Sequence, residues 1–257
     1  MRCPGDPGRS REEVCTSLRV VFVRRGAFVR EVRGVAGLAD PATFYLERDG
    51  DVERFEHPCG PDTCTTLAVE PGLLGSLADP DRQRVVGPFA STARLDVAHR
   101  TLVVAARQGA PADELAERAL ALAAVALAEA LGEAPTPAGG RRARRLAGAA
   151  RAPLAADLDM GLVDLARTVG VSPYGLSRTF RAAMGVTLSR YRRRLRVRRA
   201  LDLLEEGEAN LAFVAVQAGF ADQAHMTRAV REECGRTPGR LRLLLGRPAL
   251  SGEPTVS

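Results

Sequence analysis

Residues 165–180 read LARTVGVSPYGLSRTF, and residues 214–230 read VAVQAGFADQAHMTRAV. Alanine lets two helices approach closely, and glycine adopts the positive φ that ends one helix and redirects the chain. Both stretches contain a small residue, three intervening positions, a glycine and an apolar residue, at Ala166, Gly170 and Val171 and at Ala215, Gly219 and Phe220. The repeat therefore predicts two helix-turn-helix units.

A second helix is expected to begin directly after each turn. Ser172 and Asp222 stand where side-chain oxygens can cap free backbone N–H groups. Pro173 occupies the first helical position, where its missing N–H is not needed. Each helix then buries two apolar side chains four residues apart and leaves its other face free, as a helix does when it enters the major groove of DNA. The buried pairs are Leu176 with Phe180 and Met226 with Val230.

The free faces carry matching residues when they are counted from the two caps. Arg178 and Arg228 stand six residues after the cap. An arginine on the groove side can contact guanine with two hydrogen bonds, worth roughly 1–3 kcal/mol of discrimination. Five residues after the cap stand Ser177 and Thr227, whose hydroxyls suit phosphates or base edges. These four residues are the first candidates for DNA contacts.

The charge distribution supports a polyanionic partner for the same region. The chain has no lysine, and residues 141–247 hold 21 arginines against 10 acidic residues, whereas residues 1–140 hold 16 arginines against 20. Codon bias explains the choice of arginine over lysine, but it does not explain why one part is basic and the other acidic. A nucleic-acid partner for the C-terminal part does.

A helix is predicted over residues 187–206, between the two units. At 1.5 Å per residue, about 19 residues span about 28 Å, and successive major-groove faces on one side of DNA lie about 34 Å apart. The helix therefore has a suitable length to hold two reading helices one turn of DNA apart. Among its arginines, Arg193 and Arg194 are the predicted phosphate contacts.

The run from about 141 to 244 resembles the DNA-binding domain of the AraC family. The resemblance rests on LARTVGVSPYGLSRTFRAAMGVTLSRYRRRLRVRRALDLL and VAVQAGFADQAHMTRAVREECGRTPGRLR. It implies seven helices, with two helix-turn-helix units joined by a central helix. Where that family has aromatic residues in the second unit, this chain has Met226, Val230 and Cys234, which implies a smaller second core. The implied DNA contacts are Tyr174, Ser177, Arg178, Arg181, Gln223, His225, Thr227 and Arg228.

The N-terminal part shows another pattern. Short β-rich runs between residues 17 and 90, punctuated by glycine and proline, predict a small β-barrel, and Asp49-Gly50 between two runs predicts a hairpin. Residues 92–131 then show helical spacing. Strands followed by two helices resemble the cupin-like domain that precedes many AraC-type domains, which implies a small-molecule effector and a dimer interface on the helices.

One segment of this part carries possible metal ligands. His57, Cys59 and Cys64 lie within eight residues, so they could ligate zinc or form a thiol sensor. The paired histidines of metal-binding cupins are missing, however, and the favoured interpretation is a buried histidine and buried thiols in the barrel wall. We therefore predict no metal and no other cofactor.

The predicted fold class is α+β: residues 14–131 form the cupin-like domain, 132–140 a Pro/Gly-rich linker, and 141–247 an all-α DNA-binding domain. The predicted function is that of a DNA-binding transcription regulator and not of an enzyme. We expect a cytoplasmic homodimer away from membranes, which would bind double-stranded DNA and, as an activator, RNA polymerase. The alternatives are a metal- or thiol-based sensor, a cupin-type enzyme fused to a DNA-binding module, and a thiol-dependent DNA-repair protein.

Overall fold

The computed structural model of the chain describes residues 2–3, 12–57, 61–70, 87–131 and 141–246. The strands are β1 (Arg2–Cys3), β2 (Glu13–Val14), β3 (Leu18–Arg25), β4 (Phe28–Val32), β5 (Val35–Ala39), β6 (Thr43–Glu47), β7 (Val52–Glu56), β8 (Asp62–Val69) and β9 (Phe89–Ala90). The helices are α1 (Ala93–Arg107), α2 (Ala112–Leu131), α3 (Arg141–Ala156), α4 (Leu162–Thr168), α5 (Pro173–Met184), α6 (Leu188–Glu205), α7 (Leu211–Gln217), α8 (Gln223–Cys234) and α9 (Pro238–Leu245).

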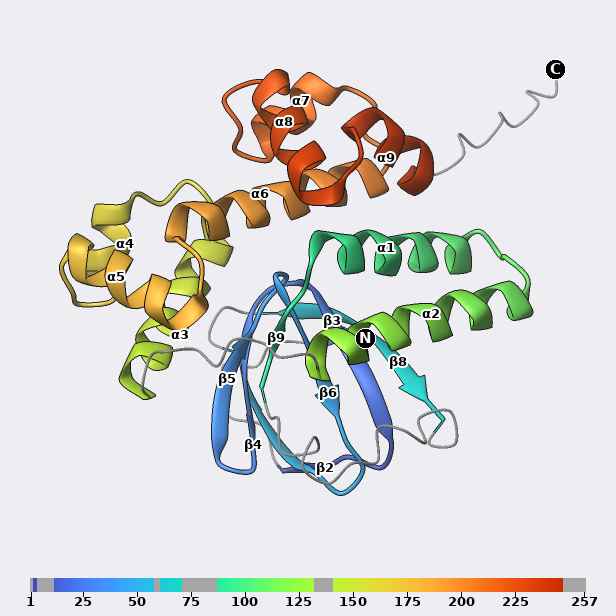
Figure 1. Cartoon of the computed structure of the whole chain (residues 1–257), viewed down its shortest axis with the longest axis horizontal. Coiled ribbons are helices and arrows are strands. Elements are labelled where there is room, and N and C mark those ends of the chain that lie inside the picture. The colour runs from blue at the N-terminus through green and yellow to red at the C-terminus, as the bar shows by residue number, and fades with distance from the viewer. Residues whose placement is uncertain (1, 4–11, 58–60, 71–86, 132–140, 247–257) are drawn as a thin grey trace, which may run out of the picture. The chain divides into compact units, whose positions relative to one another are not determined.

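The mixed α+β class is confirmed, since every described strand precedes the helices along the chain (Figure 1). The described residues 141–246 contain seven helices, and the predicted central helix is α6. The predicted linker, residues 132–140, lies outside the described residues. Across the described part of the chain, none of the helices combines the length and the apolar character needed to cross a bilayer.

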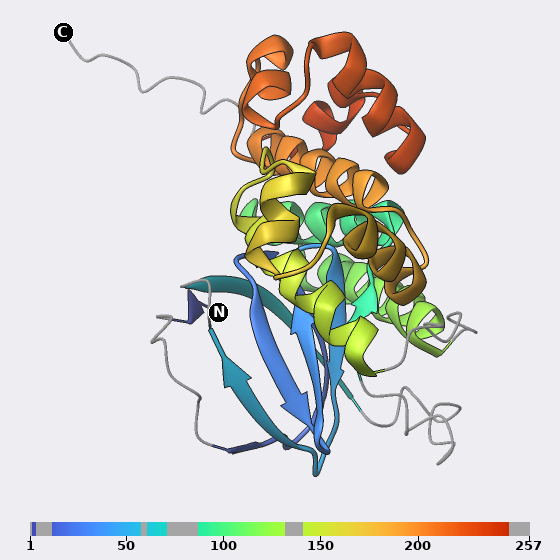
Figure 2. The same ribbon diagram turned by 90° about the vertical axis from the view of Figure 1, so that its left-hand side faces the viewer.

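The described strands form two antiparallel sheets instead of one closed barrel. The sheet orders are β1-β8-β3-β6-β9 and β2-β7-β4-β5, and the strands can be followed in Figure 2. Residues of both sheets share one core, because Val21 and Tyr45 of the first pack with Phe28 and Ala39 of the second. The predicted barrel is thus a pair of sheets over a common interior, and the cupin-like resemblance stays a prediction.

The prediction of a hairpin at Asp49-Gly50 is wrong. The turn itself forms, with the Asp51 N–H donating to the Arg48 carbonyl over 3.0 Å and with Gly50 at φ 79°. However, β6 before it pairs with β3 and β9, while β7 after it pairs with β4 and β2. The dipeptide fixes only the local turn, and the turn carries the chain from one sheet to the other.

The hairpin that does form joins β4 to β5. Its two central residues, Arg33 and Gly34, both have positive φ, 50° and 74°, as two-residue turns between twisted strands require. Inside β5, Gly37 faces Pro88 so closely that an added Cβ would lie 2.6 Å from the proline Cδ. Gly37 is therefore needed for close packing inside a strand, whereas the sequence pattern predicted that it would separate two strands.

The chain divides into two compact units that cut across its sequence order. One unit comprises Met1–Thr92 with Leu120–Leu195, and the other comprises Ala93–Ala119 with Arg196–Ser257. Each unit therefore combines a piece of the N-terminal part with one helix-turn-helix. The predicted domain boundaries, 14–131 and 141–247, stay predictions.

Helix α1 belongs to the core of the second unit. Val97 of α1 is buried together with apolar residues of α6, α7, α8 and α9. One turn later, the Arg100 guanidinium donates to Asp202 over 2.7 Å and to Glu205 over 3.1 Å. This face of α1 is covered within one chain, so only the remaining surface of α1 and α2 is left for the predicted dimer interface.

Candidate nucleic-acid interface

We call residues 141–195 the first module and residues 196–246 the second module. In the first module, α4 ends at Thr168 with Val169 as its C-cap, and Gly170 takes the left-handed φ of 71°. The Val171 N–H then donates to the Ala166 carbonyl over 3.0 Å, which closes the turn. The Ser172 side chain accepts from the Gly175 N–H over 3.1 Å, so α5 begins where the sequence predicts.

The second module repeats this turn with one additional residue. Gly219 takes φ 81°, and the Phe220 N–H donates to the Ala215 carbonyl over 2.9 Å. The Asp222 carboxylate accepts from the His225 N–H over 2.6 Å and caps α8. Two residues separate the caps of the first turn and three those of the second. Both predicted helix-turn-helix units are therefore present.

The predicted core side chains anchor both second helices. The side chains of α5 and α8 that were expected to pack are fully buried, and the alanine before each turn is buried as well. This confirms that each helix turns one apolar face inward. The residues are Leu176, Phe180, Met226, Val230, Ala166 and Ala215.

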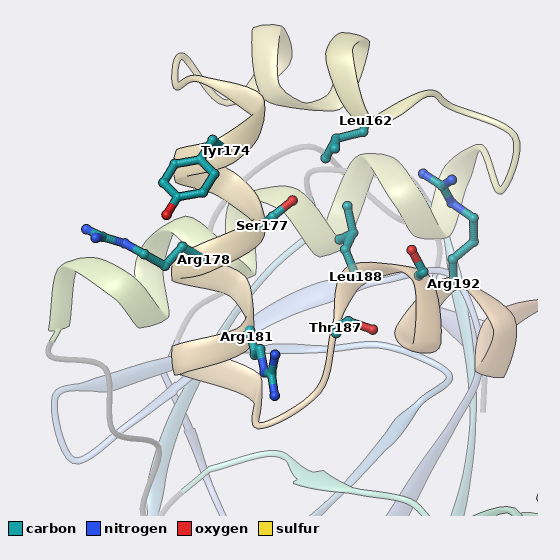
Figure 3. Close-up of a pocket in the computed structure, with 9 residues that line it drawn as sticks. Leu162, Tyr174, Ser177, Arg178, Arg181, Thr187, Leu188 and Arg192 are labelled. Atoms are coloured by element: carbon teal, nitrogen blue, oxygen red, sulfur yellow. The ribbon is translucent and has the colours of Figure 1, made fainter.

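The outward face of α5 carries the candidates of the first module. Tyr174 is 78% exposed, Arg178 and Arg181 are exposed, and Ser177 is half-buried. Figure 3 shows Tyr174 and Arg178 extending from the same side of α5. The structure thus brings these four residues onto one helix face that is open to a ligand.

The outward face of α8 carries those of the second module. Gln223 and Arg228 are exposed, whereas Thr227 and His225 are half-buried. The His225 ring meets Phe220 edge to face, with 5.3 Å between the centroids, so it packs on its own turn. Arg228 occupies the position that Arg178 occupies in α5, six residues after the cap.

A groove runs between α5 and the start of α6 (Figure 3). Its volume is about 390 Å³, and most of the residues that line it carry a hydroxyl or a guanidinium group. The Thr187 hydroxyl accepts from the Arg190 N–H over 3.3 Å at the head of α6. Such a wall suits an anionic backbone. The lining residues are Leu162, Tyr174, Ser177, Arg178, Arg181, Thr187, Leu188, Ser189 and Arg192.

One pair of arginines in the two modules has a role that sequence reasoning missed. Arg192 donates to the Met160 carbonyl over 2.6 Å, and Arg242 donates to the Ala209 carbonyl over 2.8 Å. Each carbonyl directly precedes the N-cap residue of α4 or α7. These arginines thus fix the backbone directly before the first helix of each helix-turn-helix. Their equal distance from Thr187 and Thr237 is the signal that could have revealed the pair.

The predicted phosphate contacts, Arg193 and Arg194, lie in α6 and are half-buried. Further along the same helix, Arg198 is only 4% exposed and points toward Asp96, with 3.8 Å between Nε and Oδ2. The arginine-rich helix α6 is therefore not exposed to solvent along its whole length, because its second half packs against α1.

The candidate metal segment contains a buried polar cluster. His57 Nδ1 lies 2.9 Å from Asp62 Oδ1, and the Cys64 thiol donates to Asp62 Oδ2 over 3.4 Å. Cys59, the third predicted candidate, lies outside the described residues. Among the described residues, no group of three or more His, Cys, Asp or Glu side chains, this cluster included, is arranged so that it could hold a metal ion.

Comparison with known proteins relates the region that contains both turns to helix-turn-helix proteins. Residues 165–243 match a family model described as a helix-turn-helix domain. The HTH-type transcriptional regulator GlxA of Rhizobium meliloti (strain 1021) is 36% identical over 78 residues, which cover 30% of this chain and 24% of that protein. The probable transcription factor PqrA of Proteus vulgaris is 32% identical over 78 residues, covering 30% of this chain and 64% of that protein.

The HTH-type transcriptional activator RhaR of Klebsiella pneumoniae subsp. pneumoniae is 34% identical over 73 residues, covering 28% of this chain and 26% of that protein. The match thus spans less than two thirds of each of these three relatives. A solved AraC-type DNA-binding protein from Chromobacterium violaceum is 25% identical and covers 43% of this chain and 100% of its own, with a TM-score of 0.39.

Proposed function

We propose that this chain, whose residues 165–243 form a helix-turn-helix domain of the AraC-type transcription-regulator family, reads two consecutive major-groove segments of DNA with α5 and α8. The carrying observation is the equal placement of Arg178 and Arg228, each on an outward helix face six residues after a side-chain cap. A bidentate arginine at that place reads guanine. The half-buried Arg193 and Arg194 sit on the joining helix, where they can meet phosphates.

The finer parts of the function belong to the N-terminal part. We propose that the two-sheet part binds a small-molecule effector, as its cupin-like resemblance implies, and that the chain acts as a cytoplasmic homodimer and as an activator that contacts RNA polymerase. Leu120 and Val125 of α2 are 45% and 47% exposed. Two large apolar side chains on one helix are suited to a contact between copies of the chain.

Substitution of the reading arginines tests the main proposal. The wild-type chain first selects duplexes from a random-sequence library, and the enriched sequence is called the selected duplex. Arg178→Ala or Arg228→Ala should weaken binding to the selected duplex by about tenfold or more, since each lost bidentate contact removes roughly 1–3 kcal/mol of discrimination. Binding to a random duplex should change much less.

Arg54→Ala is the matched control, because it removes a partly exposed arginine of β7 that pairs with Glu12. We expect this variant to bind both duplexes as the wild-type chain does. Equal losses on the selected and the random duplex for Arg178→Ala and Arg228→Ala would contradict the base-reading assignment.

A further inference from the structure

A buried polar cluster connects the two sheets to the first module. Both lie in the compact unit formed by Met1–Thr92 and Leu120–Leu195. Asp40, which directly follows β5, is 0% exposed, Arg151 of α3 is 5% exposed and Tyr191 of α6 is 2% exposed. Arg151 Nη2 and Nε lie 2.8 Å and 2.9 Å from Asp40 Oδ2. The Tyr191 hydroxyl donates to the same carboxylate oxygen and accepts from Arg151 Nε over 3.0 Å. Three segments far apart in sequence thus share one charge centre.

The connection between β5 and β6 holds the carboxylate of Asp40 in place. The Ala42 N–H donates to Asp40 Oδ1 over 3.0 Å, and the Thr43 hydroxyl donates to the Asp40 carbonyl over 2.8 Å. Ala42 itself packs into the apolar core of the first module. The carboxylate therefore cannot turn toward solvent unless this turn opens and the core loses Ala42.

The cluster reaches the outward face of α5 through one ring contact. The Tyr191 ring meets Phe180 edge to face, with 5.4 Å between the centroids and 62° between the planes. Phe180 is fully buried in α5, and Arg178 and Arg181 flank it in sequence. Because close-packed interiors transmit small displacements, a shift of Tyr191 would displace Phe180 and with it the helix that carries these two arginines.

Removal of the Asp40 charge would leave a cation without its carboxylate partner in this buried site. Burial acts to lower the pKa of Arg151, but Asp40 and Tyr191 outweigh it and hold that pKa above its ordinary value. An arginine stays protonated, so it cannot escape by losing its proton. Loss of one partner of a buried pair is strongly unfavourable for this reason, and the structure would relax by moving α3 or Tyr191.

We propose that Asp40 is a positioning residue for the first DNA-reading helix: through Arg151, Tyr191 and Phe180, a carboxylate of the sheet part fixes α5 in the orientation that reads bases. This inference rests on the proposed function, because it requires α5 to read DNA. It predicts that specific DNA affinity depends on a residue outside the DNA-binding domain, whereas affinity for random DNA does not.

The test is Asp40→Asn in the full chain, at a temperature where circular dichroism shows the variant to be folded. Binding is measured on the selected duplex and on a random duplex of the same length. We expect a loss of about tenfold on the selected duplex, the equivalent of one good interaction, with little loss on the random duplex. A hydroxyl-radical footprint should lose protection over one half of the selected duplex and keep it over the other.

Glu53→Gln is the matched control. Glu53 forms a buried pair with Arg30 in the same unit, with 1% and 3% of the two side chains exposed, and the Arg30 hydrogen bonds stay within the sheets. This variant should lose stability but keep wild-type affinity and footprint when folded. Equal losses in Asp40→Asn and Glu53→Gln would overturn the proposal, because they would reduce the effect to general destabilisation.

Tyr191→Phe decides the matter if Asp40→Asn does not fold. It removes the hydroxyl and keeps the ring contact with Phe180, and we expect about a threefold loss on the selected duplex alone. Wild-type affinity in Tyr191→Phe or in a folded Asp40→Asn overturns the proposal. If the wild-type chain selects no duplex, the proposed function fails and this inference with it. If it selects one that Asp40→Asn binds equally, the inference alone fails.

Discussion

The two modules share one backbone plan, yet they present different surfaces. At matching positions on the first helix of each turn, the first module has an exposed ion pair, Asp164 with Arg167 at 2.7 Å, and the second has Phe213 and Val216, 46% and 63% exposed. After the capping threonines Thr187 and Thr237, the half-buried Arg193 and Arg194 of the first module correspond to the exposed Leu243 and Leu244 of the second. The two modules thus share their caps and the arginine six residues after each cap, whereas these charged side chains of the first module correspond to apolar side chains in the second.

The modules also differ in what holds them to the rest of the chain. The first is joined to the sheet part by Asp40, Arg151 and Tyr191. The second is joined to α1, where Arg100 contacts three carboxylates, those of Asp96, Asp202 and Glu205. Two copies of one helix-turn-helix plan are thus held in different ways, since each copy has its own buried anchor.

The largest effect is expected from Arg100→Met. This change leaves the three carboxylates of Asp96, Asp202 and Glu205 close together, and breaking a buried pair on one side costs about 3–5 kcal/mol. Amide hydrogen exchange should therefore show α8 losing protection by about that free energy, while α5 keeps its protection. Equal loss of protection in both helices would show that the modules do not have separate anchors.

The same anchor gives the second module a pH dependence. Burial acts to raise the pKa of Asp96, but Arg100 and Arg198 outweigh it and hold that pKa below its ordinary value. A carboxyl with a depressed pKa stabilises the fold above its unfolded pKa of about 4, and this contribution is lost as the pH falls toward the folded value. Protection of the α8 amides should fall over that range of pH.

The next effect compares the two cores. Phe180→Ala removes a fully buried ring that contacts Tyr191 and should destabilise the first module by about 3–5 kcal/mol. Val230→Ala, at the matching position of α8, removes two methyl groups and should cost about 2 kcal/mol. Hydrogen exchange of α5 and of α8 measures the two values separately. Equal values would contradict the smaller second core that the sequence predicts.

The parts of this structure that could be predicted from the sequence are those fixed by residues close together along the chain. Ser172 and Asp222 cap helices through hydrogen bonds that span three residues, and Gly170 and Gly219 take the φ that their turns require. The outward register of Arg178 and Arg228 follows from those caps. Side-chain chemistry and helical period were sufficient for all of them.

The parts that could not be predicted from the sequence depend on contacts between residues far apart along the chain. Asp40 and Arg151 are 111 residues apart, and Arg100 and Asp202 are 102 apart. No spacing rule connects such pairs, because tertiary packing alone brings them together. The same reason underlies the wrong hairpin at Asp49-Gly50: a turn dipeptide reports its own backbone, while the partners of β6 and β7 were decided by the other strands of each sheet.

The smallest effect concerns electrostatics, and it tests the surface difference directly. If the first module meets the DNA backbone with Arg193 and Arg194, then Arg193→Gln with Arg194→Gln should lower the slope of log affinity against log salt by about 2, since each lost phosphate contact changes it by about 0.9. The loss should be the same for the selected and the random duplex, because phosphate contacts carry no sequence information.

The reciprocal variant, Leu243→Arg with Leu244→Arg, gives the second module the charges of the first. Leu243 is 81% exposed and Leu244 is 41% exposed, so the fold can accept both changes. If the second module meets DNA in the same orientation, the salt slope should rise by about the amount that the first pair loses. An unchanged slope would mean that this surface faces away from DNA. The natural leucines at these two positions would then mark a side of the second module that does not contact the DNA backbone, unlike the corresponding side of the first module.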